Sequence, residues 1–255
     1  MRILLTNDDG INAKGMGVLQ RIAAQLSDDV WVAAPASEQS AVSRCVSLHN
    51  PVHAKKLDDK TYAVTGTPTD CVIVAIRDLM KDHKPDLVLS GVNRGQNLAE
   101  DITFSGTIAG ALQGMEMGVP SIALSLARGF QGARSLPWET AEAHGPKLIK
   151  DLLAAGWPEN VVLSVNFPDT APDAVKGVQI TRQGARDYEM QGIDKRDHPR
   201  GGSYYWLTYG AGLSNPPDGT DLRAIYDGYI SVTPLHTDLT HQETIARLQE
   251  GFKSD

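Results

Sequence analysis

The chain has 255 residues, of which 41% are hydrophobic and 22% charged, as expected of a soluble globular protein with one large α/β domain or two small ones. Its formal net charge of −7 shows that basic residues are not in excess, as a nucleic-acid-binding surface would require, so no nucleic-acid polymer is expected as a partner. The longest apolar run, residues 71–76, is far shorter than the roughly 20 residues of a membrane helix. With no visible signal peptide and two isolated cysteines, Cys45 and Cys71, we expect a cytoplasmic protein without a membrane partner.

Short apolar runs alternate with helical patterns through the first two thirds of the chain. The runs predict strands at residues 2–6, 30–34, 61–64, 87–90, 121–126 and 161–166. Such alternation is typical of βαβ units. The predicted fold is therefore α/β, with a doubly wound, mostly parallel sheet between two layers of helices.

Helices are predicted between these strands. Apolar residues at helical spacing indicate one over residues 16–26. The clearest start is at Thr67, because a proline follows at the first helical position and Asp70 stands three residues after the cap. That helix is expected to continue to Met80. Others are expected from about Ser105 to Gly118, over residues 138–155 and over residues 240–252.

Residues 182–220 differ from the rest of the chain. This stretch is rich in glycine, has no helical period and contains Tyr204, Tyr205, Trp206 and Tyr209. We expect a β-hairpin here, with aromatic side chains that contact another subunit rather than substrate. The chain is thus interpreted as a single domain over residues 1–255, with an oligomerisation arm inserted at 183–220 and a C-terminal segment at 221–255.

Polar clusters follow several predicted strands, and in a doubly wound sheet this is the edge where ligands bind. Asn7-Asp8-Asp9-Gly10 follows the first strand, and further clusters at residues 35–40 and 91–97 follow two others. Adjacent carboxylates repel unless a cation lies beside them, although a solvated turn would also favour these residue types. Carboxylate, hydroxyl and amide oxygens suit Mg²⁺, Mn²⁺ or Ca²⁺ rather than zinc. Pro51 lies between His49 and His53, so that pair is interpreted as loop histidines.

The segment Phe104-Ser105-Gly106-Thr107 opens a predicted helix with small and hydroxylated residues. Unpaired N–H groups and the positive end of the helix dipole favour a phosphate at such a position. Plain N-capping by Ser105 is the alternative. A cation on the same edge of the sheet favours the phosphate interpretation.

Several other functions lack their sequence signals. No GxGxxG motif follows the first strand, and neither a phosphate-binding P-loop motif nor a GxSxG elbow is found. A receiver-type signalling domain would need an aspartate where Ser90 stands. A nucleotidyl- or glycosyl-transferring enzyme would need an acceptor domain for which little chain remains. A nucleotide- or phosphate-sensing module without turnover stays open.

In order along the chain, the stretches "ILLTNDDG", "AAPASEQSAVS", "GTPTDCV", "DLVLSGVNRGQN" and "DITFSGTIAGALQG" resemble the SurE family, the survival-protein-E nucleotidases. The motifs "VNFP" and "GYISVTPL" extend the resemblance over nearly the whole chain. It implies a Rossmann-like phosphatase that hydrolyses nucleoside monophosphates with one divalent metal ion per subunit, Mg²⁺ or Mn²⁺. Both 5′- and 3′-nucleotides, and polyphosphate, are substrates to consider.

The resemblance also assigns residues. It implies metal ligands at Asp8, Asp9, Ser40 and Asn93, and phosphate contacts at Asn97, Ser105, Gly106 and Thr107. Catalysis then falls to Asp8 and Asp9, with Asp9 as the base that activates water, or with either as the site of an aspartyl-phosphate.

The family further implies an assembly: a homodimer with exchanged C-terminal segments, or a homotetramer joined through an extended hairpin. One departure affects the loop after Ser40. The family commonly has glycine there, whereas this chain has Ala41-Val42-Ser43-Arg44. This puts the conformation of that loop in question, rather than the ligand.

Overall fold

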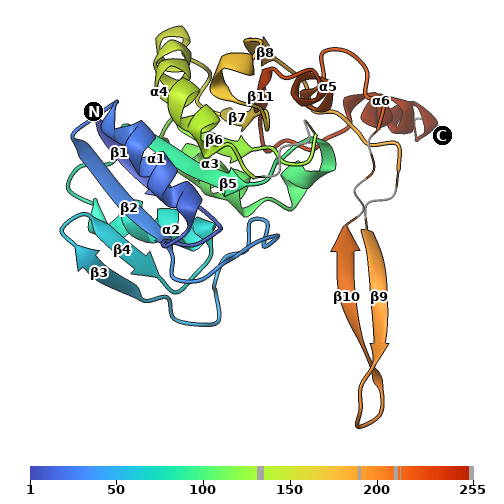
Figure 1. The fold of residues 1–255 in the computed structure, drawn as a ribbon, viewed down its shortest axis with the longest axis horizontal. Coiled ribbons are helices and arrows are strands. Elements are labelled where there is room, and N and C mark those ends of the chain that lie inside the picture. Colours follow the sequence, from blue (N-terminus) through green and yellow to red (C-terminus); the bar gives the residue numbers. More distant parts are fainter. Residues whose placement is uncertain (131–134, 189–190, 210–211, 213, 253–255) are drawn as a thin grey trace.

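The computed structural model describes residues 1–130, 135–188, 191–209, 212 and 214–252. Within them, nine strands form one sheet in the order β3-β4-β2-β1-β5-β6-β7-β11-β8. Figure 1 shows this sheet as the centre of the molecule. Its strands are β1 (Arg2–Thr6), β2 (Asp29–Pro35), β3 (Ala54–Asp58), β4 (Thr61–Val64), β5 (Leu87–Arg94), β6 (Ser121–Leu126), β7 (Val162–Phe167), β8 (Val178–Ile180) and β11 (Ile230–Leu235).

The sheet is mostly parallel, as predicted. All pairs are parallel except β3 with β4 and β11 with β7. The six predicted strands are confirmed, with β5 continuing to Arg94. Strands β3, β8 and β11 were not predicted. All five residues of β3 are exposed, β8 has three residues, and Pro234 interrupts the strand pattern of β11, so none carries an ordinary strand signal.

Helices cover both faces of the sheet. They are α1 (Lys14–Ala24), α2 (Pro68–Val74), α3 (Gly106–Glu116), α4 (Trp138–Ala155), α5 (Asp221–Tyr226) and α6 (Gln242–Gly251). Ile3 and Leu5 of β1 pack in a core that includes residues of α1 and α4, whereas Leu4 packs in the core under α2. This alternation follows from the two-residue period of a strand, and it gives the three expected layers.

The N-terminus of α2 has the predicted capping box. The Thr67 hydroxyl accepts a 3.2 Å hydrogen bond from the Asp70 N–H, and Asp70 Oδ2 accepts one of 3.0 Å from the Thr67 N–H. One long helix to Met80 was expected, but the regular α-helix ends at Val74. A π-helical turn, η1 (Ala75–Leu79), follows it. Two short 3₁₀ turns, η2 (Ala99–Thr103) and η3 (Pro172–Ala174), lie elsewhere in the chain.

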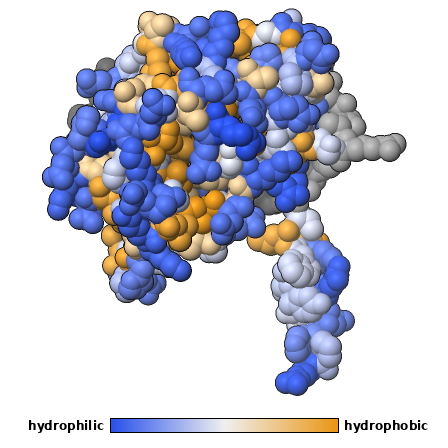
Figure 2. Space-filling view, turned by 60° about the vertical axis from the view of Figure 1, so that its left-hand side comes forward, coloured by the Kyte–Doolittle hydropathy of each residue, from blue (hydrophilic) through white to orange (hydrophobic). Residues whose placement is uncertain are grey.

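The hairpin predicted within residues 182–220 is present. Strands β9 (Gln191–Asp197) and β10 (Ser203–Tyr209) pair in antiparallel register and project from the body of the molecule, as Figures 1 and 2 show. Tyr204, Tyr205, Trp206 and Leu207 are exposed on it. Helix α6 likewise has no buried residue. In the described part of the chain, no helix has both the length and the apolar character to cross a membrane.

Candidate active site

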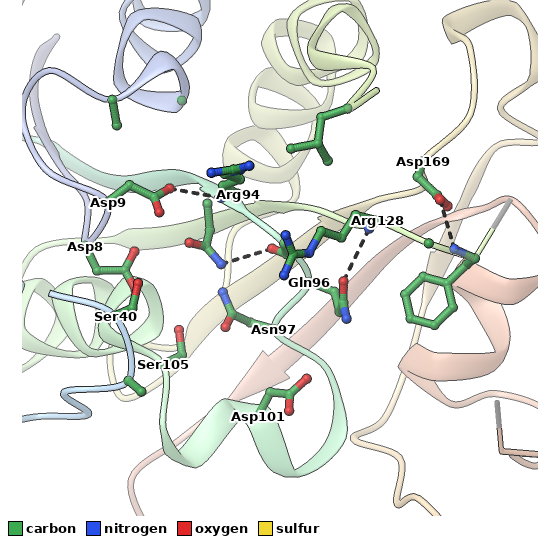
Figure 3. A pocket seen from close by; sticks show the side chains of 18 of the residues that line it. Asp8, Asp9, Ser40, Arg94, Gln96, Asn97, Asp101, Ser105, Arg128 and Asp169 are labelled. Carbon is green, nitrogen blue, oxygen red and sulfur yellow. Dashed lines mark hydrogen bonds between the residues drawn. The ribbon is translucent and has the colours of Figure 1, made fainter. Parts of the chain in front are cut away.

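An open cavity of about 1350 Å³ lies at the carboxyl-terminal edge of the sheet (Figure 3). Strands β1, β2 and β5 end beside it, and α3 begins there. This is the position at which the parallel topology predicts a ligand. Six of the predicted site residues line it: Asp8, Asp9, Ser40, Asn93, Asn97 and Ser105. His49 and His53 are exposed and do not line it.

Asp8 is held at the end of β1 by the first turn of α3. Its carboxylate Oδ1 accepts a 2.6 Å hydrogen bond from the Thr107 hydroxyl. Only 4% of Asp8 is exposed, and burial raises its pKa to about 6, opposed by the Thr107 bond and increased by the charge of Asp9. A Cβ at position 106 would lie 2.8 Å from the Asp8 Cβ, so the close approach of α3 requires glycine there.

Asp9 is partly exposed and faces the cavity. Its Oδ2 accepts a 3.0 Å hydrogen bond from the Arg94 N–H. Burial raises the pKa of Asp9, and Glu38 adds to this, while the Arg94 amide and the charges of Arg94 and Arg128 act against it. The turn that carries both aspartates ends at Gly10, whose φ of +96° favours glycine. The solvated-turn interpretation thus describes the backbone but leaves the buried carboxylate of Asp8 unexplained.

Ser40 and Asn93 supply neutral oxygen atoms to the same cavity. Ser40 Oγ donates a 2.9 Å hydrogen bond to Glu38 Oε1, which leaves its lone pairs available. Asn93 Nδ2 donates to the Gly95 carbonyl at 3.0 Å, so the amide oxygen is the atom that can serve as a ligand. Two carboxylates with a hydroxyl and an amide oxygen form a donor set that fits Mg²⁺ or Mn²⁺. No group of three or more His, Cys, Asp or Glu residues that could hold a metal occurs in the described part of the chain.

Asn97 is fixed by side chains at the ends of the next two strands. Its Nδ2 donates to Ser125 Oγ at 2.8 Å. Its backbone N–H donates to Asn166 Oδ1, also at 2.8 Å, and Asn166 Nδ2 returns a bond to the Asn97 carbonyl. Sequence reasoning did not assign this role to Asn166, although its place at the end of a strand was a usable signal. Asn97 is therefore presented to the cavity in a fixed orientation.

The residues at the N-terminus of α3 differ in whether they line the cavity. Ser105 is the N-cap, because its Oγ accepts a 3.0 Å hydrogen bond from the Ile108 N–H, and it also lines the cavity. The capping alternative is therefore observed, and the hydroxyl proton remains available to a ligand. Gly106 and Thr107 do not line the cavity. Thr107 is fully buried and its hydroxyl is bonded to Asp8, so the structure places it behind the site rather than in it.

The loop after Asn97 is anchored to the base of the arm, which sequence reasoning did not find. The Ala99 N–H donates to Asp221 Oδ2 at 2.9 Å, and Asp221 Oδ1 accepts the Gly184 N–H at 2.8 Å. Arg186, with only 4% of its side chain exposed, pairs with Asp101 at 2.7 Å and with Glu100 at 3.2 Å. Such contacts join residues far apart in sequence and leave no local motif.

A family model described as survival protein SurE matches residues 3–190. The chain belongs to the SurE family. A relative from Hyphomonas neptunium named 5′-nucleotidase SurE is 58% identical over 254 residues, with 100% of both chains covered. One of the same name from Caulobacter vibrioides is 57% identical over 250 residues, covering 98% of this chain and 95% of the relative. A crystal structure of the SurE protein from Aquifex aeolicus, 38% identical, superposes with a TM-score of 0.84 and covers 98% of this chain and 99% of that one.

The loop after Ser40 has two residues in the left-handed region of the backbone. Ala41 has φ of +58° and Ser43 has φ of +52°, a region that favours glycine. Ser43 ties the loop to the turn before α3, since its N–H donates to the Phe104 carbonyl and its hydroxyl to the Thr103 carbonyl. This loop therefore adopts a glycine-like conformation at two positions that are not glycine.

Proposed function

We propose that this protein is a 5′-nucleotidase that hydrolyses nucleoside monophosphates to nucleoside and phosphate. The observation that carries the proposal is the buried Asp8 beside Asp9, packed against the Ser105-capped start of α3 at one cavity. A site for a cation next to a site for an anion suits a phosphate monoester. The 5′-nucleotidase name of its relatives in the SurE family supports the same activity.

Asp8, Asp9, Ser40 and Asn93 would hold one divalent ion, Mg²⁺ or Mn²⁺. When bound, the ion supplies Lewis acidity to a phosphoryl oxygen and compensates the two neighbouring carboxylates. Both carboxylates have raised pKa values in the chain alone, as expected of ligands whose positive partner is a bound cation. Thr107 orients Asp8, and the Arg94 N–H orients Asp9.

The phosphoryl oxygens would be bound by Asn97 and by the Ser105 hydroxyl, and the positive end of the α3 dipole would add to the attraction. Asp9 would be the base that takes a proton from the attacking water, because it lines the cavity and is more accessible than Asp8. Formation of an aspartyl-phosphate on Asp8 or Asp9 is the competing pathway. Acid quenching during turnover, followed by mass spectrometry of the peptide that contains both residues, separates the two.

The activity is tested by phosphate release from a panel of 5′- and 3′-nucleoside monophosphates and polyphosphate. Protein treated with EDTA should release none, and Mg²⁺ or Mn²⁺ should restore release. Asp9→Asn should lower kcat/KM by well over tenfold, more than about 1.4 kcal/mol. The control is Asp59→Asn, because the Asp59 side chain is 99% exposed.

Two results would contradict parts of this proposal. Full activity after removal of all metal would reject the role of the cation. Binding of nucleotides without release of phosphate, with metal present, would favour a sensing module. We also propose a cytoplasmic location, which the free thiols of Cys45 and Cys71 support.

We further propose that the protein forms a homodimer in which residues 221–255 are exchanged, and that the β9–β10 hairpin joins dimers into a tetramer. The exposed aromatic residues of the hairpin support this, as does α6, which buries none of its residues within the chain. In this assembly each chain would remain one α/β domain carrying its own metal and phosphate residues.

A further inference from the structure

Beyond the proposed nucleotidase site, we infer that Arg94 and Arg128 form a second anion subsite, next to the metal ligands, for a phosphoryl group of the substrate that is not cleaved. Arg94 is the last residue of β5, and Arg128 follows β6. Both line the cavity that contains Asp9 and Asn97. The inference rests on the function proposed for that cavity.

Backbone contacts bring the two arginines together. The Arg94 N–H is bonded to Asp9 Oδ2, and the Arg128 N–H donates to Gln96 Oε1 at 3.3 Å. The loops after β5 and β6 are thus joined at the cavity. Figure 3 shows the Arg128 side chain extending over the cavity towards Asn97, with Arg94 beside Asp9.

The guanidinium groups lie close enough to Asp9 to lower its pKa by their charge, but within the described part of the chain neither forms an ion pair. Among the ion pairs of the described residues, none includes Arg94 or Arg128. Arg186, which lines the same cavity, is instead paired with Glu100 and Asp101. Arg94 and Arg128 supply positive charge to a cavity that acidic side chains also line, so a second phosphoryl group would bind beside these two arginines. Their planar donor groups suit phosphoryl oxygens.

The cavity has room for such a substrate. Its volume of about 1350 Å³ exceeds the roughly 300–1000 Å³ of typical small-molecule sites, so a nucleoside monophosphate leaves part of it free. The class of substrate is a nucleotide with two phosphoryl groups. Either a nucleoside diphosphate or a nucleoside 3′,5′-bisphosphate has this chemistry.

The reaction on this substrate is a single hydrolysis. A water oxygen bonds to the phosphorus at the Asp8–Asp9 end, and the bond from that phosphorus to the leaving oxygen breaks. The proton that Asp9 takes from water goes to the leaving oxygen. The second phosphoryl group stays on the product and is held by Arg94 and Arg128, so phosphate and a nucleotide with one phosphoryl group fewer are formed.

The test compares AMP, ADP and adenosine 3′,5′-bisphosphate as substrates of the parent protein, Arg94→Gln, Arg128→Gln and the double variant. In the parent, at least one two-phosphate substrate should have a lower KM than AMP. Arg128→Gln should raise that KM by about tenfold or more while changing the KM for AMP by less than about threefold, and Arg94→Gln and the double variant should also raise the KM for that substrate. Arg77→Gln, at an exposed arginine outside the cavity, should behave as the parent. Which substrate responds identifies the source of the second phosphoryl group.

A second measurement separates binding from turnover. Calorimetric titration of the same three nucleotides into EDTA-treated protein, with chromatography to verify that they stay intact, should show a weaker Kd for the responding nucleotide in the double variant. Equal losses of affinity for AMP and for the two-phosphate nucleotides would mean that the arginines bind the cleaved phosphoryl group. Unchanged affinity for all three nucleotides would mean that the arginines bind no phosphoryl group. Either result overturns the inference. A parent protein that releases no phosphate from any substrate would instead reject the proposed function.

Discussion

The hydroxyl of Thr107 donates to the carboxylate of Asp8, and this contact joins the first turn of α3 to the end of β1. Because both residues are buried, the bond fixes which Asp8 oxygen is left for a cation. Thr107→Val should retain the packing but remove the donor. We expect Mg²⁺ or Mn²⁺ to bind at least about tenfold more weakly, since contacts behind a ligand commonly contribute tenfold or more. Calorimetry of metal binding measures this, with Thr103→Val as the control, and unchanged affinity would contradict it.

The raised pKa of Asp8 predicts how the stability of the metal-free protein depends on pH. The ordinary value of 3.8 describes the unfolded chain, and about 6 describes the folded one. The folded state therefore holds the proton more tightly. The stability that this provides is fully present below pH 3.8 and is lost as pH rises through 6. Asp8→Asn should remove this loss, so at pH 8 the metal-free variant should be about 1–3 kcal/mol more stable than the parent.

Urea denaturation at pH 5 and at pH 8 measures the effect. The advantage of Asp8→Asn should be smaller at pH 5, where the parent carboxyl is largely protonated. Addition of Mg²⁺ should stabilise the parent and not the variant, because the variant lacks a ligand charge. An equal advantage at both pH values would contradict the assignment to Asp8.

The left-handed backbone at Ala41 predicts a gain in stability on substitution by glycine. An L-residue at φ of +58° costs about 1–2 kcal/mol relative to the right-handed region, and glycine avoids most of this. After the larger entropy of the unfolded glycine chain is subtracted, Ala41→Gly should stabilise the protein by about 0.5–1 kcal/mol. The matched control is Ala36→Gly, at an exposed alanine without positive φ, which should destabilise it. Thermal melts of both variants decide the sign.

The hydrogen bonds of Asp221 predict that the base of the arm affects substrate binding. It accepts backbone N–H groups from Ala99, Gly184 and Leu222. Asp221→Asn loses one of its two acceptor oxygens, which should cost about 1–3 kcal/mol of stability. Because Ala99 precedes the Ser105 cap and follows Asn97, KM for AMP should rise more than kcat falls. Asp218→Asn, at an exposed aspartate in the same segment, is the control. A fall in kcat alone would contradict a positioning role.

We expect the hairpin to be needed for assembly but not for catalysis. Replacement of residues 191–209 by a short Gly/Ser linker retains Gln183 and Arg186, which anchor the loop before α3. Light scattering should show a lower mass for this variant than for the parent, while phosphate release continues. A monomeric parent at micromolar concentration would reject the assembly, and an unchanged mass would reject the role of the hairpin.

The sequence predicted what depends on local pattern. The bounds of α4 and of strands β1, β4 and β6 follow from apolar periodicity, and the start of α2 follows from the side chains of Thr67 and Asp70. The polar clusters on the carboxyl edge could be predicted because parallel strands bring their ends together, and the resemblance to the SurE family assigned eight metal and phosphate residues. Six of these eight residues line the cavity.

Contacts between distant segments could not be predicted in the same way. The position of Thr107 behind Asp8 depends on how closely α3 approaches β1, a distance that no motif encodes. Arg94 ends β5 and Arg128 follows β6, so the two residues meet only in three dimensions. The π-helical turn after α2 also has no clear sequence cause, because the apolar stripe continues through Ile76 and Leu79.

The two outer strands of the sheet determine how copies of the chain can meet. All five residues of β3 are exposed, including the consecutive lysines Lys55 and Lys56, and β8 at the other edge has only three residues. Two copies that paired through β3 would place lysines of both copies on each face of the joined edge, and β8 is too short to guide a partner strand. The sheet therefore resists open-ended growth into fibrils. Subunits are therefore expected to contact one another through elements outside the sheet, where assembly can stop at a closed number of subunits.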